Sequence, residues 1–216
     1  MGTLAHSVKV GSILFSGALI CFATQLRANT ADSALIGVNQ GTISFEVATN
    51  VPALRVHGKS SALTARARVD SGADGFVLEQ IEAAVPVRSL ETGLALRDDH
   101  MRKYIFTTAE GEIPDVRFSS ERVECPRSGS ARRATCSVTG ALAIRGASRP
   151  FVMMLTITEE NGSIRASGHG VVKLSTYGID QPSQLGVRTT DEVKLKLELT
   201  ARRSSPQGAI GSVAAR

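Results

Sequence analysis

The chain has 216 residues, a length that fits one all-β domain or two small domains, and its formal net charge is +5. Lys9, Arg27 and Asp32 give the first 34 residues +1, and three arginines after Ala201 give the tail +3, which leaves +1 for the body. A nearly neutral body, in a chain with 4% aromatic residues and no Trp, lacks the basic, base-stacking surface of nucleic-acid binders, so we discount nucleic acid as a partner.

Residues 1–34 have the pattern of a secretory signal peptide and leader. A weakly basic start is followed by an apolar run from Val10 to Ala23 and then by small and polar residues. A membrane anchor is the alternative, but the run is shorter than the roughly 18 residues that a spanning helix needs. We therefore expect export of the chain without stable membrane insertion.

From residue 42 onward, apolar and polar residues alternate. Ile43, Phe45 and Val47 share one face of a predicted strand, and the residues between them are polar or small. The same pattern predicts about eight strands, and Asn161-Gly162 predicts a hairpin. After the first strand, the pattern recurs at 54–59, 63–69, 77–87 (Val77 inward), 116–118, 138–144, 151–157, 164–174 and 193–199.

Strands with one apolar face bury those faces together when the sheet closes on itself. The sequence therefore predicts an all-β fold, a closed antiparallel eight-stranded barrel spanning residues 35–201. Arg97 to Phe106 breaks the alternation and is expected to form a short helix across one barrel end. Side-chain parity slips between Phe118 and Val123, which predicts a β-bulge. The tail, residues 202–216, is expected to be disordered.

Two cysteines follow the leader and flank a loop rich in Arg, Ser, Gly and Pro. If the loop closes a hairpin, Cys125 faces Cys136 and Val123 faces Val138, close enough for a disulfide. We expect this bridge to have a structural role, because disulfides persist in the compartment that an exported chain enters.

The inward row contains unusually small residues, namely Ala65, Ala67, Ala83, Gly168 and Gly170. They fill less volume than Leu or Phe, which predicts an apolar tunnel inside the barrel. The alternative is that these residues allow close backbone approach and that side chains fill the barrel.

Four stretches in order carry a resemblance to a known family. Ser89–Gly93 followed by Arg97–Met101, then Pro114–Ser120, Val138–Gly146 and Tyr177–Ile179, together resemble the YceI-like signature. The resemblance implies a lipocalin-like barrel in the bacterial periplasm whose apolar tunnel holds a polyisoprenoid or another long-chain amphiphile, quinone-like molecules among them. It also implies a non-enzymatic protein, and related barrels make a homodimer plausible.

Inward parity and the helix name the residues expected to line this tunnel. They are Phe45, Val56, Ile81, Ala83, Val85, Met101, Phe106, Phe118, Met153, Leu155, Leu174 and Tyr177. Arg97, Asp99 and His100 are expected to form a polar mouth that meets the ligand headgroup through charge-assisted hydrogen bonds. The alternative is that Arg97, Asp98, Asp99 and His100 form a helix start whose members pair with one another.

The sequence offers little for catalysis. The histidines show no metal-ligand spacing, and no serine sits in a Gly-x-Ser-x-Gly elbow, so we expect no metal, no cofactor and no nucleophile. Two other functions stay open: a periplasmic stress or interaction protein with a side-chain-filled barrel, and a lipid hydrolase or isomerase acting at His100.

Overall fold

The computed structural model describes residues 32–72, 75–125, 133–160 and 163–202. Contacts divide the chain into Met1–Thr30 and Ala31–Arg216, and the described residues all belong to the second unit. Residues 1–31 of the predicted signal peptide and leader, the Asn161-Gly162 turn and residues 203–216 of the tail lie outside the described residues, so these expectations stay predictions. Arg202, which was expected in the tail, belongs to the last strand.

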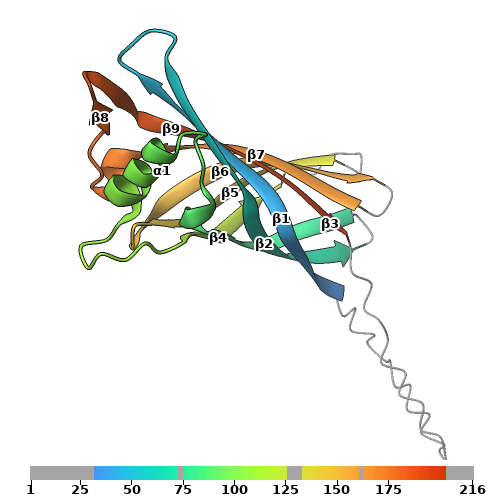
Figure 1. The fold of residues 1–216 in the computed structure, drawn as a ribbon. Coiled ribbons are helices and arrows are strands. Elements are labelled where there is room, and N and C mark those ends of the chain that lie inside the picture. Colours follow the sequence, from blue (N-terminus) through green and yellow to red (C-terminus); the bar gives the residue numbers. More distant parts are fainter. Residues whose placement is uncertain (1–31, 73–74, 126–132, 161–162, 203–216) are drawn as a thin grey trace, which may run out of the picture. The chain divides into compact units, whose positions relative to one another are not determined.

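Eight long antiparallel strands form a barrel that closes by pairing of the first strand with the last, as predicted (Figure 1). The strands are β1 (Asp32–Thr49), β2 (Arg55–Gly72), β3 (Gly75–Val85), β4 (Val116–Glu124), β5 (Arg133–Ile144), β6 (Ala147–Glu160), β7 (Ser163–Lys173) and β9 (Val187–Arg202). The two-residue strand β8 (Ser183–Gln184) pairs only with β9. The domain was expected to start at residue 35, but β1 begins three residues earlier, at Asp32.

Helical segments gather at one end of the barrel (Figure 1). They are η1 (Val87–Ser89), α1 (Ala95–Met101), the π-helical η2 (Arg102–Phe106) and η3 (Leu174–Tyr177). The predicted helix is confirmed and begins two residues earlier than expected. Its buried side chains include Met101 and Phe106, which pack on the barrel core. Within the described ranges, no helix has the length and hydropathy to span a bilayer.

Two of the register shifts between strands change which side chains face inward in β3 and β4. The predicted bulge in β4 is confirmed, since the β4–β5 register shifts between Ser120 and Arg122 and leaves Glu121 as the extra residue. A second shift, between β2 and β3, leaves Glu79 extra. The alternation had placed Val77 inward, but because of this extra residue it is Leu78 that is buried in the core.

The barrel end away from the helices is solid, and we call it the closed end. The predicted disulfide is confirmed: Cys125 and Cys136 are bonded with their Cα atoms 4.1 Å apart, and Val123 pairs with Val138. The Cys136 side chain is fully buried. Around it lie other buried residues of the closed end, namely Ile36, Leu78, Ile157, Ile164 and Ala201.

Candidate ligand-binding site

A cavity of about 1110 Å³ fills the half of the barrel under the helices. Every long strand contributes to its wall, and α1 and η2 cover it. Most of the residues expected in the tunnel line it, namely Phe45, Val56, Ile81, Ala83, Val85, Met101, Phe106, Phe118, Met153, Leu155 and Leu174. The barrel is therefore hollow at this end, and the side-chain-filled alternative describes only the closed end.

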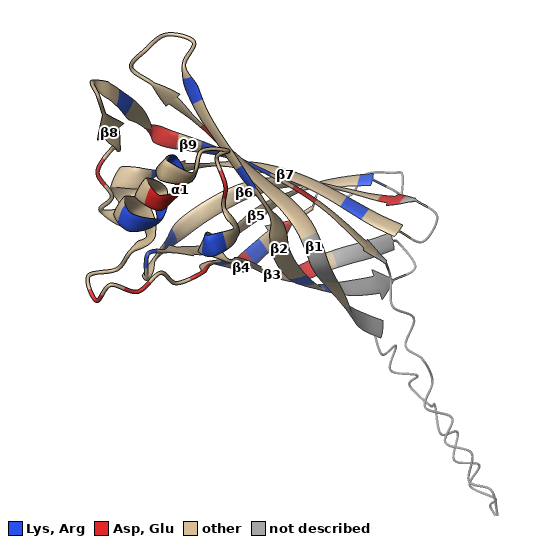
Figure 2. Cartoon of the chain, viewed as in Figure 1, with Lys and Arg blue, Asp and Glu red and all other residues tan. Residues whose placement is uncertain are grey.

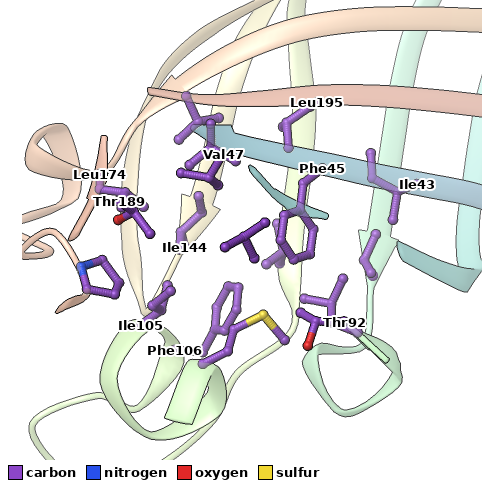
Figure 3. A pocket seen from close by; sticks show the side chains of 18 of the residues that line it. Ile43, Phe45, Val47, Thr92, Ile105, Phe106, Ile144, Leu174, Thr189 and Leu195 are labelled. Atoms are coloured by element: carbon purple, nitrogen blue, oxygen red, sulfur yellow. The ribbon is translucent and has the colours of Figure 1, made fainter. Parts of the chain in front are cut away.

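Cross-strand pairing of inward residues makes the cavity wall apolar. In the register of β1 with β9, Ile43 opposes Leu197 and Phe45 opposes Leu195. Figure 3 shows Phe45 and Leu195 on the wall and Phe106 on η2 directed into the same space. The period of two along each strand puts the strand side chains on one face, so this part of the wall is hydrocarbon.

The small inward residues contribute to the cavity unequally. Ala65 and Ala83 line it. Gly168 and Gly170 were expected to leave room too, but neighbours fill the space beside them. A Cβ atom at Gly170 would lie 2.6 Å from Cζ of Phe151, and one at Gly168 would lie 3.0 Å from Sδ of Met153. At these glycines the alternative holds: they allow close packing.

Within the part of the chain that the structure describes, the cavity is blind at the closed end. The lining residues farthest along their strands toward the closed end include Ala65 on β2, Leu155 on β6 and Leu199 on β9. Beyond them, the buried closed-end residues Ile157 and Ile164 do not line it. At the helical end it reaches the surface between α1, the β1–β2 connection and the β8–β9 hairpin, and we call this opening the mouth.

At the mouth, Arg97 and Asp98 are held by Thr92. Arg97 Nε donates to Thr92 Oγ1 at 2.8 Å, and the backbone N–H of Thr92 donates to the Asp98 carboxylate at 2.7 Å. Arg97 and Asp98 thus share Thr92 as a partner and do not pair with each other, and Arg97 also lines the cavity. Such bonds fix the guanidinium at the opening with part of its donor set committed.

The other two residues of the expected mouth differ in position. His100 lines the cavity, and its ring makes an edge contact with Tyr104 at 5.7 Å between centroids. Asp99 does not line the cavity: it is exposed and forms an ion pair with Arg102 at 3.1 Å. A headgroup at the mouth would therefore meet Arg97 and His100, and Asp99 has a surface role.

Tyr177 does not line the cavity, and its hydroxyl instead links two elements at the helical end of the barrel. Its buried hydroxyl donates to the carbonyl of Leu142 at 3.1 Å, which ties η3 to β5. Burial raises the pKa of this phenol, and the nearby Arg149 opposes the shift. The Tyr177 hydroxyl therefore stays neutral at physiological pH and donates this structural hydrogen bond.

A second hydrogen-bonded contact at the helical end joins η3 to β9. The Asp191 carboxylate accepts hydrogen bonds from the Ser175 backbone N–H at 2.8 Å and the Ser175 hydroxyl at 2.7 Å. These bonds lower the pKa of Asp191, because they favour its charged form.

Several mouth residues were missed from the sequence. The segment Asp180–Leu185, with Val187 and Thr189, lines the mouth, and so does Arg145 in the β5–β6 turn. Thr189 Oγ1 is buried there with no hydrogen-bond partner among the described residues. No alternation marks this segment, and the only usable signal was Gly186, a turn residue before the last strand.

The described residues contain no cluster of three or more His, Cys, Asp or Glu side chains that could hold a metal ion.

Comparison with known proteins gives a family match and several solved structures of the same fold. The model of the YceI-like domain matches residues 36–201. Burkholderia cenocepacia BcnA is similar with a TM-score of 0.59 and 19% identity, covering 74% of this chain and 96% of that one. A Campylobacter jejuni YCEI protein has a TM-score of 0.58 and 19% identity, covering 72% and 90%.

A third structure is a polyisoprenoid binding domain from Saccharophagus degradans, implicated in plant cell wall breakdown. It has a TM-score of 0.55 and 14% identity and covers 80% of this chain and 99% of that one. At these identities the likeness shows a shared fold. No curated protein matches the chain.

Proposed function

The chain belongs to the YceI-like domain family, and we propose that it binds one long-chain isoprenoid or fatty amphiphile inside its barrel. The observation that carries the proposal is the blind apolar cavity of about 1110 Å³. Small-molecule sites are concave and mostly apolar, with a few polar groups that fix orientation. The cavity wall and the polar mouth have this division.

The geometry favours a ligand that enters tail first. The apolar wall surrounds the tail, and Arg97 and His100 lie at the opening where a headgroup would remain in contact with water. Burying ten methylenes would contribute on the order of 8 kcal/mol before ordering costs. Hydrocarbon burial alone is therefore enough for tight binding, and the polar groups set orientation.

We propose binding and not catalysis. Among the described residues, His100 is the one histidine that lines the cavity, and its ring contacts the Tyr104 ring. Within the described residues, no carboxylate or hydroxyl is hydrogen-bonded to His100, so a base positioned by an acid, or a nucleophile next to a base, is not assembled there. The family resemblance to non-enzymatic barrels supports the same proposal.

We further propose that the protein functions in the periplasm. The Cys125–Cys136 disulfide supports this, since structural disulfides persist outside the cytoplasm. Cell fractionation with thiol alkylation tests it: the protein should appear in the periplasmic fraction with both cysteines protected. A homodimer stays a prediction.

The ligand can be identified directly. The protein would be purified from its native compartment without detergent, extracted with organic solvent and analysed by mass spectrometry against a denatured, washed sample. We expect one long-chain species near equimolar amount. An empty protein that also refuses added polyprenols and fatty acids would contradict the proposal.

A further inference from the structure

The mouth is surrounded by exposed apolar side chains that we call the apolar rim. Most of the exposed large hydrophobic residues among the described ranges lie here. The apolar rim consists of Val51, Leu54, Leu94, Leu96, Tyr104 and Leu185. Exposed apolar groups that gather at one place mark an interaction site. We propose that this rim docks the mouth onto a lipid bilayer.

Three segments far apart in the sequence build the rim. They are the β1–β2 connection, the start of α1 with η2, and the β8–β9 turn, and Figure 1 shows all three at the same barrel end. Leu54, Tyr104 and Leu185 also line the cavity. The apolar surface therefore continues from the cavity wall onto the outside of the protein, which gives a hydrocarbon chain a path that avoids water.

Leu185 carries the strongest sign of an outside partner. It has φ of 51°, in the left-handed region, and Gly186 follows with φ of 82°. A leucine in this region is unfavourable, and Asn or Gly is usual in such hairpin turns. The side chain is 98% exposed, so it gains almost no burial from the described residues around it. Backbone strain combined with an exposed apolar side chain is explained when the contact lies outside the protein.

Charges on the rim fit lipid headgroups. Lys103 lies over the Tyr104 ring at 5.3 Å, and Arg188 pairs with Ser183 in the β8–β9 hairpin. Neither cation forms an ion pair with a described carboxylate. Apolar side chains at the acyl boundary with Tyr, Lys and Arg at the headgroup level are typical of bilayer-interface segments.

Figure 2 shows both signs of charge at the helical end, and Asp180 also lies at the mouth, so apolar insertion should be the main attraction. The choice of a bilayer as occupant rests on the proposed function, because a long-chain amphiphile resides in bilayers.

The experiment uses the full protein and vesicles without any added isoprenoid or free fatty acid. Binding to phosphatidylcholine vesicles, with and without phosphatidylglycerol, would be measured by flotation. A variant with Val51→Ser, Leu94→Ser and Leu96→Ser changes rim residues that do not line the cavity. The matched control changes exposed residues of the β6–β7 wall, Val152→Ser and Val171→Ser.

We expect the wild type to bind both vesicle types and the rim variant to bind about tenfold more weakly, since three apolar contacts with the acyl boundary are lost. The control should bind like the wild type. Absence of wild-type binding to both vesicle types, or equal losses in rim and control variants, would overturn the proposal. Uptake of a fluorescent fatty acid without vesicles should be unchanged in the rim variant, which separates failure of docking from failure of ligand binding.

Leu185→Asn gives a second test. Asn tolerates the left-handed turn, so Tm should rise while vesicle binding weakens. A fall in Tm would contradict the backbone strain at Leu185, and unchanged vesicle binding would show that Leu185 has no role in docking.

Discussion

The two ends of the barrel are built from the same strands and the same alternation, yet one is solid and the other is hollow. At the closed end, Ile157 and Cys136 are buried without bordering any cavity, whereas under the helices Ile43 and Ala83 face open space. Side chains interlock at the closed end, and the space for the proposed ligand lies where they do not. This difference predicts that equal substitutions have unequal effects at the two ends.

The largest expected effect is loss of packing at the closed end. Ile157→Ala should lower the free energy of unfolding by about 2 to 5 kcal/mol, because a fully packed isoleucine is replaced by a void. Ile43→Ala should lower it by clearly less, since the side chain already borders the cavity and loses fewer contacts. Urea unfolding of both variants measures the difference, and equal losses would contradict the distinction between the ends.

Removal of the disulfide should be the next largest effect. Cys125 and Cys136 are 11 residues apart, and the chain-entropy model gives such a bridge about 2 to 3 kcal/mol of stabilisation. The double variant Cys125→Ala, Cys136→Ala should therefore unfold at lower urea concentration. Fatty-acid uptake measured below the transition should match the wild type, because the bridge is remote from the mouth. Weaker uptake by the folded double variant would show that the two ends are coupled.

At the hollow end, filling should affect binding and spare the fold. Ala83→Leu adds three carbons to the cavity wall and should weaken binding of a long-chain ligand by about 2 kcal/mol, the burial of roughly three methylenes. Ala84→Leu is the matched control, since Ala84 neighbours Ala83 on β3 and does not line the cavity. Titration with a fluorescent fatty acid compares the two, and equal affinities would place the ligand elsewhere.

The smallest expected effect is a change in stability with pH that depends on Asp191. The pKa of Asp191 is lowered by its hydrogen bonds from Ser175, so its charged form stabilises the fold. This contribution is present above the unfolded-state pKa of about 4 and is lost as pH falls through the lower folded-state pKa. Solvent screening keeps it below about 1 kcal/mol. The Asp191→Asn variant should therefore have a lower Tm than the wild type at neutral pH, and the two Tm values should converge in strong acid.

Much of this fold could be predicted from side-chain parity alone. The period of two placed Phe45, Ile81 and Met153 on the cavity wall, because a strand fixes the direction of each side chain whatever fills the interior. The parity slip before Val123 predicted the bulge in β4 in the same way. These features depend on local geometry, which the sequence records directly.

The rest depends on tertiary packing that no local pattern records. Gly170 gives no free space because Phe151 lies over it, and the sequence does not say which neighbour covers a glycine. Asp98 and Asp99 are adjacent, but a helix turns about 100° per residue, so one is buried against Thr92 and the other is exposed. The segment Asp180–Leu185 before β9 lacks any alternation that could have indicated its place at the mouth.

Because the cavity is blind, it sets a maximum length for the part of a ligand tail that can be buried. A tail that reaches Ala65 and Leu155 can go no deeper, because the described residues of the closed end beyond them are packed. Each added methylene up to that depth should gain about 0.8 kcal/mol, and each further one should gain nothing because it remains in water. In a homologous series, affinity should therefore climb steeply with chain length and then level off, and the break point would report the depth of the cavity.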